Sequence, residues 1–246
     1  SGSSSVNELR GLVTDTIRFS QVDGPGNRFV VFLQGCNFDC LACHNPHTIP
    51  MQSNDATPTT VDEILDEIRE VAPFISGVTV SGGEATLQHT FVRALFAEIK
   101  ADDELIHLTT LIDTNGSAAV EIWDELADGM DGAMVDLKAF DSDTHQRMTT
   151  RGNDRVLSSI KYLADIGKLH EVRLMIVPGE NDSTEAIART AEWLHDVDPD
   201  MSVKLIGYRP HGVRPEAENL QAATHELLDD LAQTIREAGL DNLTVV

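Results

Sequence analysis

Residues 29–43 read FVVFLQGCNFDCLAC, a predicted strand that leads directly into three closely spaced cysteines. The run Phe29–Gln34 predicts a strand buried on both faces, because such strands are nearly continuous in apolar residues. Cys36, Cys40 and Cys43 then follow in a loop at the carboxyl end of this strand. In folds that alternate strands with helices, reactive groups collect at that end of the sheet. The stretch therefore predicts an α/β fold with cysteine chemistry at one edge of its sheet.

Similar apolar runs predict the rest of the sheet. These strands are expected at Gly77–Ser81, Leu108–Asp113, Ala133–Leu137, Glu171–Val177 and Val203–Tyr208, with a short last strand at Leu243–Val246. About six alternations of strand and helix form a repeated βα unit, which is typical of a single α/β domain. The pattern leaves two architectures open, a doubly wound open sheet and an incomplete barrel. One domain is expected over residues 9–246, and residues 1–8 are interpreted as a flexible tail or a cloning scar.

Helix and turn boundaries are indicated by capping residues and by glycine. Predicted helix starts are Thr60 (a capping box with Glu63), Asp154, Asp182 (a capping box with Glu185) and Thr224, and predicted ends are Gly167 and Gly239. Pro25 and Gly26 predict a type II turn ahead of the first apolar strand, because Pro fixes one central residue and Gly allows positive φ at the other.

The composition narrows the class of protein. The chain has 246 residues, of which 41% are hydrophobic, and a formal net charge of −23. Such a negative field repels nucleic acid, so no nucleic-acid partner is expected. No apolar run reaches the roughly 18 residues of a membrane span, and the first residues lack the pattern of a secretory signal. A cytoplasmic monomer without membrane contacts is expected.

The cysteines indicate a metal centre. The chain has three cysteines in all, and they fall within the eight residues CNFDCLAC. A secreted disulfide framework is usually even in number and spread along the chain, so this pattern fits it poorly. Three thiolates suit a [4Fe–4S] cluster and leave one iron without a protein ligand. The alternative is a zinc site completed by His44, although adjacent residues rarely both reach one small tetrahedral ion.

Polar residues also follow the other predicted strands. The turn Ser81–Glu84 contains two glycines that let the backbone approach a ligand closely, and Glu84 can accept a hydrogen bond from an ammonium group. Asp113 ends the next strand, and Asp136 and Lys138 share one face of the strand after it. Arg173, Arg209 and His211 extend this polar ring. Such groups are costly at buried strand ends unless they pair or face a ligand, and ion pairing alone is the structural alternative.

With these residues assembled, the chain resembles the radical S-adenosylmethionine (SAM) activating enzymes of glycyl radical enzymes, the pyruvate formate-lyase activase family. The resemblance rests on VDGPGNRFVVFLQGCNFDCLACHNPHT (22–48), GVTVSGGEAT (77–86), DTNG (113–116), GAMVDLKAF (132–140), VRLMIVPGE (172–180) and HGV (211–213). Among these activases the YjjW-type group is the most similar, but its cysteine-rich ferredoxin-like insert is absent here. The family fold is a partial (β/α)6 TIM-like barrel, which the resemblance implies for this chain.

The resemblance also implies roles for individual residues. Cys36, Cys40 and Cys43 would bind the [4Fe–4S] cluster, and Lys138 would meet the SAM carboxylate. The residues implied for cofactor binding are Ala42, His44, Asn45, Gly82, Gly83, Glu84, Asp113, Asp136, Lys138, Arg173, Met175 and His211. A monovalent cation would lie at Asp113, Thr114, Met134 and Asp136, and the substrate loop would meet Asp23 and His44. Two positions depart from the family: Ala42 stands where an aromatic residue is common, and Arg209 aligns with a family histidine, with His211 two residues further on.

The implied activity is reductive cleavage of SAM to a 5′-deoxyadenosyl radical, which removes hydrogen from a backbone glycine of a partner glycyl radical enzyme. A flavodoxin- or ferredoxin-type protein would donate the electron. One alternative is a radical SAM enzyme that acts on a small molecule such as a deazapurine precursor. The other is a non-catalytic zinc-binding module.

Overall fold

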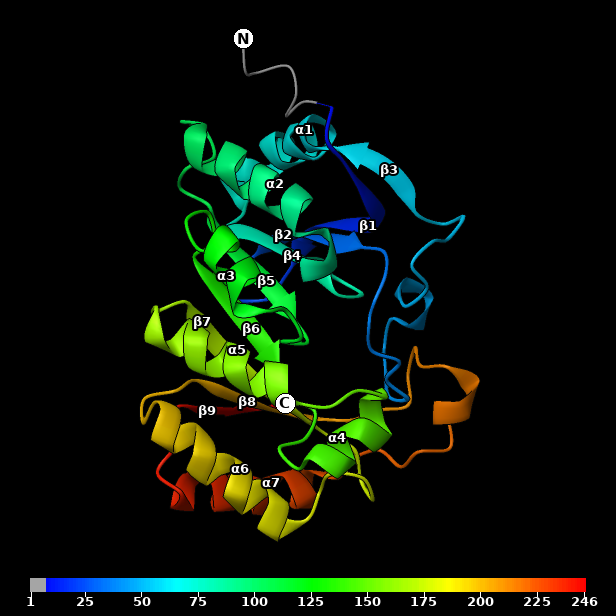
Figure 1. The fold of residues 1–246 in the computed structure, drawn as a ribbon, viewed down its shortest axis with the longest axis vertical. Coiled ribbons are helices and arrows are strands. Elements are labelled where there is room, and N and C mark those ends of the chain that lie inside the picture. The colour runs from blue at the N-terminus through cyan, green and yellow to red at the C-terminus, as the bar shows by residue number, and fades with distance from the viewer. Residues whose placement is uncertain (1–7) are drawn as a thin grey trace. The chain divides into compact units, whose positions relative to one another are not determined.

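The computed structural model describes residues 8–246, and helices and strands alternate along most of this range (Figure 1). The chain forms two compact units. The first contains the residues up to 37, 47–114 and 118–133, and the second contains 38–46, 115–117 and 134–246. The expected tail lies, apart from Glu8, outside the described residues, and the single domain over 9–246 stays a prediction. In residues 8–246, no helix has the length and apolar character needed to cross a membrane.

The sheet of the first unit has the strand order β3-β1-β2-β4-β5. Its strands are β1 (Arg10–Ser20), β2 (Arg28–Leu33), β3 (Thr57–Thr60), β4 (Gly77–Gly82) and β5 (Thr109–Thr114). β2, β4 and β5 run parallel, whereas β1 pairs antiparallel with both β2 and β3. The sequence predicted the three parallel strands to within one residue at each end. It missed β1 and β3, because β1 is largely exposed and β3 is a short threonine-rich edge strand.

Helices α1 (Val61–Val71), α2 (His89–Ala101) and α3 (Val120–Leu126) complete the first unit, with short 3-10 turns at Ala72–Phe74 and Ala85–Gln88. α2 packs against both α1 and α3. The predicted capping box is present: the Glu63 N–H donates to Thr60 Oγ1 at 3.2 Å, and the Thr60 N–H donates to Glu63 Oε2 at 2.9 Å. The predicted turn is also supported, since Gly26 has a φ of 73°.

The second unit has the strand order β6-β7-β8-β9. Its elements are β6 (Gly132–Asp136, which enters this unit at Met134), α4 (Ser142–Thr149), α5 (Asp154–Asp165), β7 (Leu169–Ile176), α6 (Thr184–Val197), β8 (Val203–Gly207), the 3-10 turn Pro215–Ala217, α7 (His225–Glu237) and β9 (Leu243–Val245). β7, β8 and β9 run parallel, and α6 and α7 pack side by side (Figure 1). All four strands were predicted, with ends shifted by at most two residues.

Four predicted helix boundaries of this unit are confirmed and one is wrong. Asp154 is the first residue of α5, Thr224 caps α7, and Gly167 and Gly239 adopt positive φ just beyond their helices. The cap of α6 is Ser183 and not Asp182, because Ser183 accepts the Ala186 N–H. Asp182 instead accepts the Gly179 N–H at 3.0 Å and closes the preceding turn.

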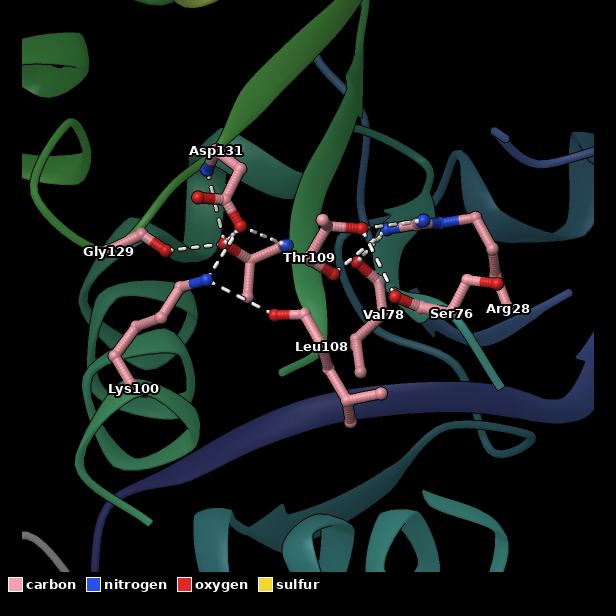
Figure 2. Close-up of polar contacts among 9 residues, drawn as sticks. Arg28, Ser76, Val78, Lys100, Leu108, Thr109, Gly129 and Asp131 are labelled. Carbon is pink, nitrogen blue, oxygen red and sulfur yellow. Dashed lines mark hydrogen bonds and ion pairs between the residues drawn. The ribbon is translucent and has the colours of Figure 1, made fainter. Parts of the chain in front are cut away.

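A polar network joins the first residues of β2, β4 and β5 (Figure 2). Arg28 is fully buried, and its guanidinium donates to five neutral oxygens: Thr79 Oγ1 (2.8 Å), Thr109 Oγ1 (2.9 Å), Thr109 O (2.9 Å), Val78 O (3.0 Å) and Pro25 O (3.2 Å). Burial lowers the pKa of Arg28 to about 10, against the opposing charge of Asp131. Asp131 itself binds Lys100 Nζ at 2.6 Å. Arg28 therefore ties three strand starts to the turn that precedes β2.

Candidate active site

The predicted site residues fall into two groups, one in each unit. Cys36 follows β2 in the first unit, whereas Cys40 and Cys43 lie in the loop 38–46 of the second, called here the cysteine loop. All three thiols are half-buried, and in the described part of the chain none forms a disulfide. The Cys43 N–H donates to Cys40 O at 3.3 Å, which closes a tight turn between these two predicted ligands.

The end of α4 holds the cysteine loop by main-chain hydrogen bonds. The Asp39 N–H donates to Thr149 O at 3.0 Å, and the Leu41 N–H donates to Met148 O at 3.3 Å. The last carbonyls of a helix have no partner within the helix, so the loop satisfies groups that α4 itself cannot. The cysteine loop is thus positioned by an element more than a hundred residues away in sequence, which local patterns could not predict.

Lys138 is a charged residue among the predicted site residues of the second unit. Its Nζ lies 3.2 Å from Asp136 Oδ2, and the two side chains are 17% and 32% exposed. Burial alone would lower the pKa of Lys138, but the charges of Asp136, Cys40 and Cys43 outweigh burial and raise it. Lys138 therefore stays protonated at neutral pH, as a group that meets a carboxylate must.

The two thiols of the cysteine loop respond to the same surroundings. Burial raises the pKa of Cys40, with Lys138 as the largest opposing influence. Burial also raises the pKa of Cys43, opposed first by a backbone hydrogen bond from Asn45 and then by Lys138. Both thiols thus depend on nearby cations, or on a bound metal, to become thiolates.

A cavity of about 250 Å³ opens beside these groups in the second unit. Cys40, Ala42, Lys138 and Met175 line it, all predicted site residues. Ala42 is buried against Val177 and Tyr208, and the partly buried side chains packed on this cluster are Met148, Met175, Val213 and Leu220. The apolar surface that an aromatic residue often supplies at position 42 is therefore provided by methionine and leucine from elsewhere in the unit.

In the first unit, the glycine turn after β4 fits tightly against the end of β2. Gly82 has a φ of 122°, and a Cβ there would lie 2.2 Å from Leu33 O. A Cβ on Gly83 would lie 2.2 Å from Gly35 O. The Gly83 and Glu84 N–H groups donate to Leu33 O and Gly35 O at 3.0 and 2.8 Å. These positions admit glycine only, so the turn is fixed one residue before the first predicted cluster ligand.

Carboxylates at the ends of β4 and β5 are held by hydroxyl groups. Glu84 is fully buried, and its Oε2 accepts from Thr114 Oγ1 at 2.6 Å. Asp113 Oδ2 accepts from Ser81 Oγ at 3.1 Å. Asp113 and Thr114 belong to the first unit, and Met134 and Asp136 to the second, so the predicted cation site stays a prediction.

The remaining predicted residues have structural partners of their own. Arg173 donates to Glu171 Oε1 at 2.8 Å and to Met134 Sδ at 3.0 Å. Asp23 accepts from Ser20 Oγ, which fixes its carboxylate within the turn before β2. The His44 ring nitrogen Nε2 lies 3.0 Å from Arg209 O, and the exposed His211 donates its N–H to the same oxygen at 2.8 Å. Sequence reasoning missed Arg214, whose contacts with the cysteine loop are described below.

The donor set fits an iron–sulfur cluster. Three thiols are present, and Lys138 compensates negative charge beside two of them. Within residues 8–246, no group of three or more His, Cys, Asp or Glu side chains converges to hold a single metal ion. A cluster does not require such convergence, because each of its thiolate ligands binds a different iron atom.

Comparison with known proteins agrees with this chemistry. The Radical SAM superfamily model matches residues 30–191. The pyruvate formate-lyase-activating enzyme of Streptococcus mutans is 36% identical over 212 residues, covering 83% of this chain and 80% of that protein. The enzyme of that name from Staphylococcus aureus (strain USA300) is 34% identical over 215 residues, covering 83% of this chain and 84% of its own length.

A solved structure shares the fold. The crystal structure of a radical SAM methyltransferase from Sphaerobacter thermophilus aligns with a TM-score of 0.66 at 19% identity, over 89% of this chain and 66% of that one. With the parallel strands of both units, this likeness confirms the predicted α/β class of the radical SAM type, with which a partial (β/α)6 TIM-like barrel is consistent. The superfamily match over residues 30–191 and the 34–36% identity to the two activating enzymes show where this chain belongs. It is a member of the radical SAM superfamily and, within it, of the family of pyruvate formate-lyase-activating enzymes.

Proposed function

We propose that this protein is a radical SAM activase that installs a glycyl radical in a partner enzyme. The single observation that carries the assignment of residues is the cavity that Cys40 and Lys138 line together. It combines a predicted cluster ligand with a cation suited to the SAM carboxylate, beside the apolar surface around Ala42. When bound, the cluster and SAM supply the one-electron chemistry that yields a 5′-deoxyadenosyl radical.

The protein's own residues bind, orient and exclude water. Cys36, Cys40 and Cys43 hold the cluster, and Lys138 meets the SAM carboxylate by a charge-assisted hydrogen bond. Gly82 and Gly83 fix the turn that places Glu84, whose carboxylate accepts a hydrogen bond from the methionine amino group. The further cofactor contacts that we propose are Ala42, His44, Asn45, Asp113, Asp136, Arg173, Met175 and His211. A monovalent cation at Asp113, Thr114, Met134 and Asp136 is part of the same proposal.

The partner's glycine would approach Asp23 and His44. A backbone glycine suits hydrogen abstraction, because it has no side chain to block access and the flanking amides stabilise its radical. A flavodoxin- or ferredoxin-type donor supplies the electron. We place a monomeric enzyme in the cytoplasm, where a reducing environment keeps three clustered thiols available for iron.

The test is anaerobic reconstitution with iron and sulfide, followed by reduction in the presence of SAM. We expect about four irons per chain and formation of 5′-deoxyadenosine. Pyruvate formate-lyase is then added, and a glycyl doublet in the electron paramagnetic resonance spectrum is expected. Absence of 5′-deoxyadenosine contradicts radical SAM chemistry. Formation of 5′-deoxyadenosine together with turnover of a small molecule such as a deazapurine precursor, and no doublet with any glycyl radical enzyme, contradicts the activase assignment.

A further inference from the structure

The segment 208–214, which follows β8, contacts the cysteine loop at several points. Arg214 Nη2 donates to Asp39 Oδ1 at 2.5 Å and to Cys40 O at 3.0 Å. The His44 ring stacks on the Tyr208 ring, with centroids 5.8 Å apart and planes inclined by 26°. The His44 ring nitrogen Nε2 also contacts Arg209 O at 3.0 Å. Segment 208–214 therefore contacts the cysteine loop at Asp39, before its two cysteines, and at His44, after them.

The segment is itself anchored in the core of the second unit. Tyr208 is fully buried, and its hydroxyl donates to Ala217 O at 2.8 Å. Its N–H donates to Ile176 O at the end of β7. The stacked His44 ring thus rests on a fixed surface. The cysteine loop is consequently held from two sides, by the last carbonyls of α4 and by segment 208–214.

Arg214 also brings a permanent charge close to the predicted ligands. Its side chain is 24% exposed, so water screens the charge only partly. The hydrogen bond that Arg214 donates to Asp39 is the largest influence that raises the pKa of Arg214, and the Cys43 thiol adds to it. A guanidinium is charged at every accessible pH. Its electrostatic effect on Cys43 is therefore constant.

We propose that Arg214 is a positioning residue for the iron–sulfur cluster: it fixes the main chain at Cys40 and stabilises the added negative charge of the reduced cluster. The inference rests on the proposed function. Outer-shell contacts orient metal ligands, and their loss typically weakens metal binding about ten- to hundredfold. Hydrogen bonding and nearby charge also set cluster potentials. A cation hydrogen-bonded to Cys40 O favours the reduced state, which is the state that reacts with SAM.

Arg209 and Arg214 contact the cysteine loop through different groups. Arg209 acts through its main-chain oxygen and has an exposed side chain, whereas Arg214 acts through its side chain. Geometry and charge at Arg214 can be varied independently. Arg214→Lys keeps the charge but loses the planar guanidinium, whose Nη2 donates to both oxygens. Arg214→Gln loses the charge, and Asp39→Asn removes a partner while Arg214 keeps its charge.

The experiment compares these three variants with wild type and with Arg155→Gln, which removes an exposed arginine of α5 and matches the change in net charge. Each reconstituted holoenzyme is assayed for iron release to a chelator and for cluster midpoint potential by electron paramagnetic resonance. We expect iron release about tenfold or more faster in Arg214→Gln, and a more negative potential in this variant alone. Arg214→Lys and Asp39→Asn should release iron faster without that negative shift.

Two outcomes overturn the inference. One is an Arg214→Gln holoenzyme that matches Arg155→Gln in both measurements. The other is an equal negative shift in Asp39→Asn, which would show that loop geometry and not charge sets the potential. Arg214→Lys and Asp39→Asn decide the positioning role even if Arg214→Gln does not fold. If the proposed function itself is wrong, wild type would bind no cluster or form no 5′-deoxyadenosine. That result differs from both outcomes above, because they require a wild-type protein that binds the cluster.

Discussion

Two cations, the buried Arg28 in the first unit and the half-buried Lys138 in the second, have opposite surroundings. Arg28 donates to five neutral oxygens, and burial lowers its pKa to about 10. Lys138 is half-buried, which would lower its pKa, but Asp136 and two thiols raise it. A cation that neutral groups satisfy completely is part of the framework. A cation beside a carboxylate and two thiols that a metal can ionise is suited to a site, because a metal or ligand alters the charge around it.

The largest effect is expected from Arg28→Met. The substitution leaves buried oxygens at three strand starts without a donor, so we expect a loss of about 3–5 kcal/mol in the free energy of unfolding. Urea unfolding of the apo-protein measures it, with the exposed Arg93→Met on α2 as the control. A loss no greater than that of Arg93→Met would show that the guanidinium is not a framework residue.

Lys138→Met should behave in the opposite way. We expect the apo-protein to lose less than about 1 kcal/mol of stability, because the substitution removes a half-buried charge and Asp136 remains partly exposed to water. Affinity of the holoenzyme for SAM should fall about ten- to hundredfold, as loss of one charge-assisted hydrogen bond predicts. Equilibrium binding to the oxidised cluster form measures this without turnover. Unchanged SAM affinity with a large loss of stability would place Lys138 in the same class as Arg28.

The smallest effect concerns Asp131, the carboxylate whose charge acts on Arg28. Burial would raise the pKa of Asp131, but hydrogen bonds from Lys100 and Thr110 outweigh it, so the pKa is lowered. A carboxylate with a lowered pKa stabilises the fold at pH values above its unfolded pKa of about 3.9. This stabilisation is lost as the pH falls through its pKa in the folded state. Asp131→Asn should therefore lower the free energy of unfolding by less than about 1 kcal/mol at pH 7. The effect is small because the Asp131 side chain is 40% exposed and water screens its charge.

The measurement is urea unfolding of wild type and Asp131→Asn between pH 2 and pH 7. The two proteins should converge in stability toward the acid end of this range. A difference that stays constant with pH would mean that the hydrogen bonds of Asp131 matter and its charge does not.

Local features were predictable from sequence and long-range ones were not. The capping box at Thr60 depends on residues three apart, and the parallel strands show continuous apolar runs, so both were predicted. A charged residue at a strand start gives no sign of burial, because the contact of Arg28 with Thr109 spans 81 residues. Arg214 reaches Asp39 across 175 residues, and no motif records that pairing. The cysteine spacing was informative because the three predicted ligands lie close together in sequence.

The dependence of α4 on the cysteine loop has a thermodynamic consequence. α4 has eight residues, fewer than the roughly 12–15 that an isolated helix needs to persist in water. The main-chain N–H groups of Asp39 and Leu41 therefore stabilise α4, because they donate hydrogen bonds to the carbonyls of its final turn. Under the proposed function, cluster assembly on the loop and formation of α4 would therefore be one coupled equilibrium, in which iron acts on a helix that contains none of the predicted ligands.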